Sequence, residues 1–375
     1  MLSFTSTSKI EKKLKHIHGL LVEVYKDLEE VTEEEKAYLN KCALISNVGA
    51  TTRIENAVLT DVEVEWVDTV LSKDGKTTAF EENKEFIVDK LSKDRQRSIE
   101  EVAGSRNVLT TIYLQAKEFQ PLREADIRAL HKELLKFYPP ADHYAGNYKT
   151  VINKVIARDS ETGHERTVLE PTEPGVMTNM AMQRLIDWYN ETIKEHPWPI
   201  LVAIEFVFRF LAIHPFQDGN GRIGRALFLL VLLQSDDKYQ EEVLRYIAID
   251  RKIEQNKEQY YTVLHQCSDG KYQEDPKKYK FETLVLFILV VFEAALADIN
   301  TYRQKFKNLK ELSESAVTVL DCFKSNPEKQ LKVADIEAST EIPRRTIQFA
   351  LSTLTKQAFL QRLGKAAGSR YQLVF

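Results

Sequence analysis

The chain has 375 residues, enough for one large domain with appendages or for two to three smaller domains. Because 43% of the residues are hydrophobic and 29% are charged, the composition excludes wholesale disorder, and a net charge of −4 argues against a polyanion-binding surface over the whole chain. Three well-separated cysteines without a CxxC pair (Cys42, Cys267, Cys322) suit a reducing compartment better than a disulfide framework.

Most of the chain has the periodicity of amphipathic helices. The first is predicted over residues 9–30, where apolar residues recur at steps of three and four on a charged background, after an N-terminus without the long apolar stretch of a secretory signal. Similar patterns predict helices over residues 33–47, 96–118, 124–137, 177–195, 200–213, 222–234, 252–267, 277–310 and 315–325.

Residues 148–171 interrupt the helices. Two runs rich in β-branched residues flank the turn-prone cluster Asp159–Gly163, which predicts a β-hairpin. Further along, the most apolar run (284–297) is shorter than the ~20 residues of a membrane-spanning helix. That run also contains Glu293, so it predicts a buried core helix, and we expect a cytoplasmic protein without a membrane partner.

The C-terminal segment predicts a helix, a second helix, a longer helix and a two-stranded wing. This order is similar to that of a winged helix-turn-helix domain, which we place at 313–375. From residue 315 onward there are nine Lys and Arg against five Asp and Glu, so this part is basic. Such domains bind DNA or dock proteins, and both partners stay open.

The loop HPFQDGNGRIGRAL, residues 214–227, concentrates the chemistry. Residues 219–224 fit the GxGxxG pattern of dinucleotide-binding proteins, but that pattern must follow a central strand. The preceding run, 200–213, is long for a strand and carries Glu205 and Arg209 four apart, where they can pair on a helix. A helix–loop–helix is therefore predicted, and no GxxxxGK[ST] phosphate loop is present.

Gly219, Asn220 and Gly221 lead into the second helix, so their N–H groups can converge into an anion-binding nest at its N-terminus. Arg222 and Arg225 follow in the first turns and can bind further phosphate oxygens.

His214 and Asp218 complete this set of residues. The Asp218 carboxylate can hold a Mg²⁺ that bridges phosphates, and His214 offers a base that titrates near neutral pH. These are the groups needed to transfer part of a nucleotide to a hydroxyl.

HPFQDGNGRIGR resembles the Fic-family signature HPFx[DE]GNGRxxR at every fixed position, and residues 115–267 are similar to a Fic core in the order of helices, hairpin and motif. The resemblance implies a mainly α fold with a hairpin flap. It also implies Mg²⁺-dependent transfer of AMP from ATP to a protein Ser, Thr or Tyr hydroxyl, with release of pyrophosphate. The expected domains are an N-terminal helical region (1–112), a catalytic domain with its following helices (113–312) and the C-terminal domain.

The resemblance also implies residue roles. His214 would deprotonate the target hydroxyl, Phe216 would anchor the loop, and Asp218 would hold Mg²⁺. Gly219, Asn220 and Gly221 would form the nest, with Arg222 on the β-phosphate side and Arg225 on the γ-phosphate. Since relatives that transfer other groups have altered loops, the intact Gly-Asn-Gly favours AMP.

Two more segments fit this family. The 148–171 hairpin lies where relatives have a flap that clamps the target protein; whether Lys149, where relatives often have Arg, performs the same task stays open. Asn256, Tyr260 and Tyr261 look like a family segment near the adenine, although a tyrosine pair on a helix fits core packing equally well.

Residues 51–56, TTRIEN, fit the family's inhibitory pattern [ST]xxxE[GN], with Thr51, Glu55 and Asn56 at its fixed positions. In relatives of this class, the glutamate pairs with the second arginine of the loop. Here Glu55 would pair with Arg225 and take the place of the γ-phosphate, which predicts autoinhibition.

Two other functions stay open: a nucleotide-sensing transcriptional regulator or partner-binding protein with little catalysis, and a transferase that uses UTP or GTP. A homo-oligomer also stays open. The other histidines form no zinc pattern and are expected at the surface or as caps: His16, His18, His131, His143, His164, His196 and His265.

Overall fold

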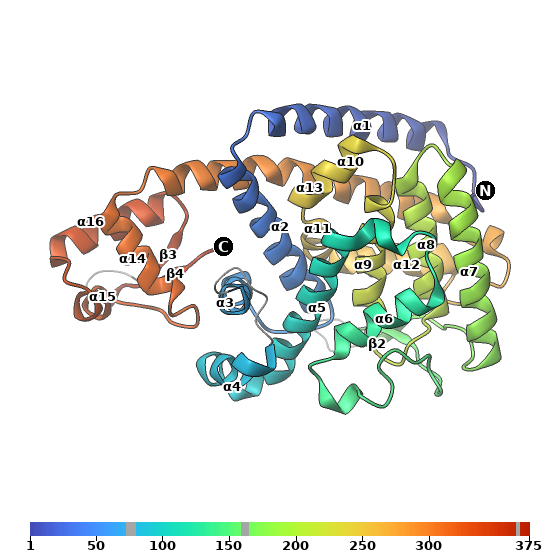
Figure 1. Ribbon diagram of the computed structural model, residues 1–375, viewed down its shortest axis with the longest axis horizontal. Coiled ribbons are helices and arrows are strands. Elements are labelled where there is room, and N and C mark those ends of the chain that lie inside the picture. Colours follow the sequence, from blue (N-terminus) through green and yellow to red (C-terminus); the bar gives the residue numbers. More distant parts are fainter. Residues whose placement is uncertain (73–79, 159–164, 365–367) are drawn as a thin grey trace.

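The computed structural model describes residues 1–72, 80–158, 165–364 and 368–375. Helices dominate these residues, and the strands form two small antiparallel sheets (Figure 1). The predicted fold class, mainly helical with a hairpin, is confirmed. The helices are α1 (Ser8–Glu29), α2 (Glu33–Ile54), α3 (Asp61–Leu71), α4 (Phe80–Leu91), α5 (Gln96–Gln115), α6 (Glu124–Leu135), α7 (Val176–Glu195), α8 (Pro199–Ile213), α9 (Asn220–Leu233), α10 (Lys238–Val243), α11 (Ile249–Gln255), α12 (Lys257–Ser268), α13 (Phe281–Lys310), α14 (Glu314–Lys324), α15 (Val333–Ser339) and α16 (Arg344–Lys356).

Helices α8 and α9 pack against each other at the centre of the main body and against α5, α6, α7 and α13 (Figure 1). Both are apolar on nearly every face, as expected for helices buried on all sides. Pro199 begins α8, where its missing N–H costs no helical hydrogen bond. Glu205, fully buried on α8, pairs with Arg209 at 3.3 Å, which confirms the helix and excludes a dinucleotide-binding strand.

Helix α13 runs along the molecule from the main body to the C-terminal elements, with α1 packed along it (Figure 1). Glu293 on α13 accepts a hydrogen bond from His16 Nε2 at 2.9 Å, so the acidic residue of this apolar run faces α1. Across the described ranges, no helix combines the length and apolarity needed to cross a membrane.

Two helical predictions need correction, and some helices were not predicted. The segment 252–267 is not one helix: Asn256 ends α11 and begins α12, with φ −124° and ψ 32°, as suits a side chain that favours caps. Helix α2 continues past residue 47 to Ile54 because its last turns are buried on all sides and lose the amphipathic period. Helices α3, α4 and α10 were not predicted.

The predicted hairpin forms from β1 (Val155–Arg158) and β2 (Glu165–Leu169), which pair antiparallel. Its turn, residues 159–164, lies outside the described residues. After β2, the Glu170 N–H donates to the Gly270 carbonyl at 2.9 Å, so the hairpin is tied to the loop after α12.

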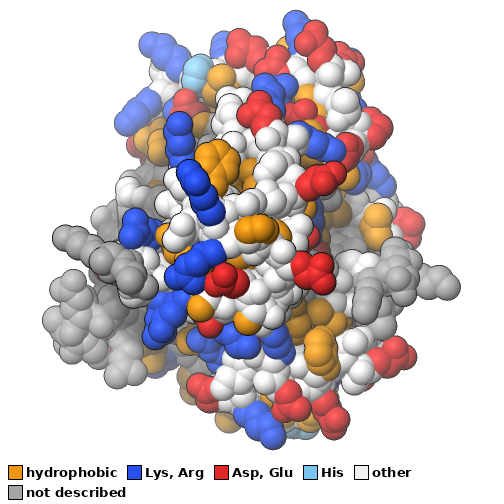
Figure 2. All heavy atoms as spheres, turned by 90° about the vertical axis from the view of Figure 1, so that its left-hand side faces the viewer, with side chains coloured by type: hydrophobic (Ala, Val, Ile, Leu, Met, Phe, Trp, Pro, Cys, Tyr) orange, Lys and Arg blue, Asp and Glu red, His pale blue; other side chains and the backbone are white. Residues whose placement is uncertain are grey.

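The C-terminal elements have a hydrophobic core of their own, built on Phe323, Ile336 and Leu351. Helices α14, α15 and α16 are followed by β3 (Leu360–Leu363) and β4 (Arg370–Leu373), which pair antiparallel. The elements come in the predicted order, while the winged-helix class and the domain boundaries stay predictions. Figure 2 views this end of the molecule, and Lys and Arg side chains run along one side of that face.

Candidate active site

The 214–227 loop joins two buried helices through two left-handed residues. His214 ends α8 with φ 51° and ψ 59°, and Gly219 precedes α9 with φ 76°, a conformation that costs glycine little. Between them, Phe216 is fully buried, as its predicted anchoring role requires. The Asn220 side chain closes the loop by accepting from the Phe216 N–H at 2.9 Å and donating to the Phe216 carbonyl at 2.7 Å.

His214 is held as a neutral base. Its Nδ1 lies 3.3 Å from the Leu211 carbonyl, which can only accept, so Nδ1 carries the proton and Nε2 keeps its lone pair. Burial, and then the positive charge of Lys149, lowers the pKa of His214 to about 4. The imidazole is therefore neutral at pH 7 and able to accept a proton.

The opposite side of the loop favours anions. The first N–H groups of α9 have no acceptor within the helix, and they carry the positive end of its dipole. Arg222 and Arg225 stand in the first turns of α9 and are 3% and 5% exposed. Two buried guanidinium groups beside a helix N-terminus fit the phosphates of a nucleotide.

A pocket of about 280 Å³ opens at this loop. It brings together most of the predicted residues: its lining includes Glu55, His214, Asp218, Gly219, Asn220, Gly221, Arg225, Tyr260 and Tyr261, together with Lys154, Val155 and Ile156 of the flap. Asn256 does not line this pocket; its side chain donates to the Lys252 carbonyl at 2.9 Å.

Asp218 lies between two cations. Its Oδ2 is 3.0 Å from Arg97 Nη2 and its Oδ1 is 3.3 Å from Arg222 Nη2. Burial alone would raise the pKa of the Asp218 carboxyl, but Arg222, then the hydrogen bond from the Gly219 N–H, and then Arg97 hold it below the ordinary value. An ionised carboxylate at a phosphate site fits Mg²⁺, which needs only one or two protein carboxylates when phosphates supply other ligands.

Helix α2 delivers a carboxylate into the same pocket. Glu55 Oε1 lies 2.9 Å from Arg225 Nη2. Thr51 binds the same guanidinium: its hydroxyl accepts from Nε at 2.8 Å, and its carbonyl accepts from Nη2, the nitrogen that also binds Glu55, at 2.9 Å. Burial acts to raise the pKa of Glu55, but the charges of Arg225 and Arg222 outweigh it and lower the pKa. The pair is therefore ionised on both sides.

Gly221 explains why Glu55 can approach so closely. A Cβ at Gly221 would lie 2.1 Å from Glu55 Oε1, a separation that atoms do not reach. The second glycine of the loop therefore leaves the space that the carboxylate fills. Asn56, the last predicted residue of this segment, lies just outside the helix with φ 73° and accepts from Lys257 Nζ at 3.1 Å.

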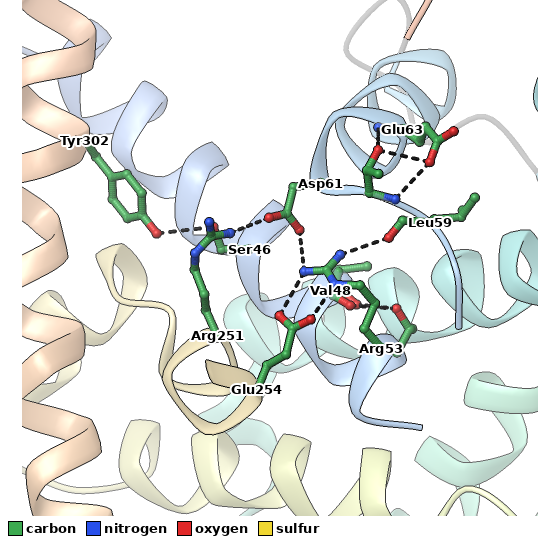
Figure 3. A network of polar contacts seen from close by, with 12 residues as sticks. Ser46, Val48, Arg53, Leu59, Asp61, Glu63, Arg251, Glu254 and Tyr302 are labelled. Atoms are coloured by element: carbon green, nitrogen blue, oxygen red, sulfur yellow. Dashed lines mark hydrogen bonds and ion pairs between the residues drawn. The ribbon is translucent and has the colours of Figure 1, made fainter. Parts of the chain in front are cut away.

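A second polar network holds the end of α2 to α11 and α3 (Figure 3). Arg53 binds both carboxylate oxygens of Glu254, from Nε at 2.6 Å and from Nη2 at 3.0 Å. It also donates to Asp61 at 2.7 Å, and Asp61 in turn pairs with Arg251. Since Arg53 lies two residues before Glu55, this network fixes the position from which Glu55 enters the pocket.

Sequence reasoning missed several residues that support the site. His131, expected at the surface or as a cap, is fully buried and stacks on Phe216 with ring centroids 3.7 Å apart. Its Nε2 donates to the Asp218 carbonyl at 2.9 Å, and its Nδ1 accepts from the Gly146 N–H. Arg97 was also missed. Only the three-dimensional fold brings residues so distant in sequence to the loop, so no local pattern reveals them.

The geometry places a neutral imidazole on one side of the pocket and the N-terminus of α9 with its buried Arg225 on the other. The sequence model of the Fic/DOC family matches residues 121–232, which hold α6 to α9 and the loop. Over these residues, the chain is similar to the Fic/DOC family.

Several curated relatives match part of the chain. The protein adenylyltransferase Fic of Drosophila willistoni is 30% identical over 125 residues, 33% of this chain and 22% of that protein. A Fido domain-containing protein of Dictyostelium discoideum is 30% identical over 82 residues, 22% of this chain and 56% of that protein. The matched region thus spans about a fifth of the length of the first relative and about half of the length of the second.

Solved structures share the fold. A Fic domain-containing signalling protein from Bacteroides thetaiotaomicron aligns with a TM-score of 0.55 and 24% identity, covering 78% of this chain and 97% of its own. A Fic family protein from Desulfovibrio desulfuricans G20 aligns with the same TM-score and 20% identity, covering 100% and 98%. The second alignment extends the likeness of fold over the C-terminal elements.

Proposed function

We propose that the chain is an autoinhibited protein adenylyltransferase. It transfers AMP from ATP to a Ser, Thr or Tyr hydroxyl of a protein target, which can be the chain itself, and releases pyrophosphate. The observation that carries the proposal is the loop itself, where a neutral His214 and the anion-binding start of α9 share one pocket. The partial identity to a protein adenylyltransferase supports the same reaction.

In this mechanism, His214 Nε2 accepts the proton of the target hydroxyl as its oxygen attacks the α-phosphorus and pyrophosphate leaves. The N–H groups of Gly221 and its neighbours, with Arg222, stabilise the charge on the phosphates, an effect of the oxyanion-hole type. Arg225 binds the γ-phosphate once Glu55 has left it. Asp218 would hold a Mg²⁺ ion, which neutralises phosphate charge when bound. The flap hairpin would pair with the target backbone as an added strand.

Incubation with labelled nucleotides tests the proposal. We expect the Glu55→Gly variant to acquire AMP from ATP on a hydroxyl side chain, identified by mass spectrometry. Glu55→Gly/His214→Ala is the control, expected to bind ATP and transfer nothing. Label from UTP or GTP instead would identify a different nucleotide donor, and no label from any of the three would refute the transferase.

The C-terminal elements support a second candidate, a regulator that binds DNA or a protein. Arg345, Gln348 and Phe349 lie on exposed positions of α16 at helical spacing, and Phe349 is 73% exposed. A large aromatic side chain left exposed beside a cation is typical of a binding surface. Binding of the full chain to random-sequence duplex DNA, compared with an Arg345→Ala/Phe349→Ala variant at two salt concentrations, tests this candidate. A pull-down with the same pair of proteins tests the protein partner.

A further inference from the structure

Lys149 lies buried directly behind the catalytic loop. Lys149 is only 3% exposed. Its Nζ donates to the Ile213 carbonyl at 3.1 Å and to Asn153 Oδ1 at 3.0 Å. The Ile213 carbonyl is the last of α8 and immediately precedes His214. A cation at this point also meets the negative end of the α8 dipole.

The backbone of the same segment binds the other side of His214. The Lys149 N–H donates to the Pro215 carbonyl at 2.8 Å, and Tyr148 forms an antiparallel bridge with Phe216. Asn153 completes the contact by donating to the Phe216 carbonyl at 2.8 Å. The carbonyls before and after His214 are thus both bound by one residue, at a position where a non-glycine residue adopts a left-handed conformation that needs support.

The charge of Lys149 acts on the imidazole without being cancelled locally. In the described part of the chain, no carboxylate lies within ion-pair distance of its ammonium, and Glu173 acts on it only at longer range. Burial lowers the pKa of Lys149 to about 8, so the side chain is charged at neutral pH.

Three charged groups act on His214 from the elements around it. Lys149 acts to lower the pKa of the imidazole, whereas Glu55 from α2 and Asp218 from the loop act to raise it. The charge of Lys149 therefore opposes the effect of the two carboxylates on the pKa of His214. Burial disfavours the protonated imidazole most, and without the charge of Lys149 the two carboxylates would raise the pKa of His214. A larger fraction of the imidazole would then be protonated at acidic pH and unable to accept a proton.

We propose that Lys149 is a positioning residue for the transfer reaction, which holds the loop on both sides of His214 and keeps its imidazole neutral. The proposal rests on the proposed function and extends it to a residue outside the loop. It also assigns a task to the position that the sequence left open.

The test separates the charge of Lys149 from its hydrogen bonds. In the Glu55→Gly background, Lys149→Met removes both, Lys149→Gln keeps a donor without the charge, and Lys149→Arg keeps both. Thr172→Val is the matched control, because the Thr172 hydroxyl donates to the same Ile213 carbonyl at 3.0 Å and carries no charge. Circular dichroism checks that each variant is folded.

The readout is the pH dependence of kcat/KM for AMP transfer between about pH 4 and about pH 7, where Lys149 keeps its charge. Lys149→Met and Lys149→Gln should move the acid limb up by about one pH unit, which corresponds to a loss of about twofold near pH 5 and about fivefold near pH 4. Lys149→Arg and Thr172→Val should leave the limb in place. An unmoved limb in both neutral variants, or an equal shift in Thr172→Val, overturns the proposal.

A second readout does not depend on transfer. Histidine labelled at Cε1 is followed by NMR in the nucleotide-free protein, with His214 assigned through His214→Ala. The His214 titration should rise by a similar shift in the two neutral variants and not in the control. If the Glu55→Gly protein transfers no AMP at any pH, the proposed function fails, and this titration alone decides the role of Lys149.

Discussion

Glu55 Oε1 lies 2.9 Å from Arg225 Nη2, and this contact joins a helix from the N-terminal region to the first turns of α9. The arginine side chain is 3% exposed, whereas a third of the glutamate side chain is exposed to the pocket. Arg225 thus donates its hydrogen bonds to Thr51 and Glu55 at the end of α2. Any group that binds Arg225 from the pocket must first displace Glu55.

The first prediction concerns the strength of this inhibition. Breaking a buried ion pair by removing one partner costs ~3–5 kcal/mol of free energy. Because Glu55 is partly exposed, we expect a value at the lower end of this range. Glu55→Gly should therefore raise the initial rate of AMP transfer by about two orders of magnitude, and Glu55→Gln by less, because its amide still reaches the guanidinium. Rates of self-labelling measure both. Equal rates in wild type and Glu55→Gly would contradict inhibition by this contact.

The Arg53–Glu254 contact predicts a second way to release the inhibition, without touching the pocket. Glu254→Gln keeps the shape of the side chain but removes the charge that holds Arg53 on both carboxylate oxygens. The end of α2 should loosen, and transfer should rise to an intermediate level, about three- to tenfold above wild type, since a partly exposed pair contributes ~1 kcal/mol.

Glu258→Gln is the matched control for this prediction. Glu258 lies on the neighbouring helix α12, is exposed, and has no ion pair with any residue that the structure describes. Its loss changes the net charge equally and should leave the transfer rate unchanged. Combining Glu254→Gln with Glu55→Gly should add nothing, because the first change acts only through Glu55. An additive gain would assign the network to another role.

The sequence predicted the helices with clear periodicity, the hairpin and the loop, because each is encoded within a few dozen neighbouring residues. It also placed Glu55 opposite Arg225, although only through the family resemblance. Lys149 and Arg97 could not be assigned, because their roles depend on long-range contacts. His131 was assigned wrongly, since a lone histidine on a charged helix gives no sign that its ring will stack on Phe216.

The third prediction concerns the cation site at Asp218. Arg97 Nη2 lies 3.0 Å from Asp218 Oδ2, and its guanidinium stacks on the Tyr138 ring at 3.4 Å from the centroid. A divalent ion at Asp218 must therefore compete with a positioned arginine. Arg97→Met should tighten binding of Mn²⁺ in the presence of an ATP analogue with a methylene between the α- and β-phosphates. Because both side chains are partly exposed, the gain should be about fivefold.

Paramagnetic resonance of free Mn²⁺ measures this affinity directly. Lys93→Met is the control, because Lys93 is a surface cation near Arg97 in sequence that pairs, among the described residues, with the exposed Asp89 alone. Its removal therefore tests the effect of net charge. Asp218→Asn should abolish the tight Mn²⁺ site in either background. Weaker binding in Arg97→Met would mean that the arginine supports the metal site rather than competing for it.

The last prediction concerns Asp250, a residue of α11 that is 7% exposed beside Arg225. Burial raises the pKa of its carboxyl to about 6, even though Arg225 acts to lower it. Between the unfolded value near 3.8 and this value, the folded protein binds more protons than the unfolded chain. Folding stability therefore falls as pH rises through this window, and the full cost of the buried charge is present above about pH 6.

Asp250→Asn removes the charge and keeps an acceptor for the Thr51 hydroxyl. The variant should melt a few degrees above wild type near pH 8, and this gain should shrink toward zero near pH 4, where Asp250 is already protonated. Differential scanning calorimetry across this range measures the difference. An equal gain in melting temperature at pH 4 and at pH 8 would reflect packing rather than ionisation. A lower melting temperature than wild type at pH 8 would mean that Arg225 needs Asp250 as a counter-ion in addition to Glu55.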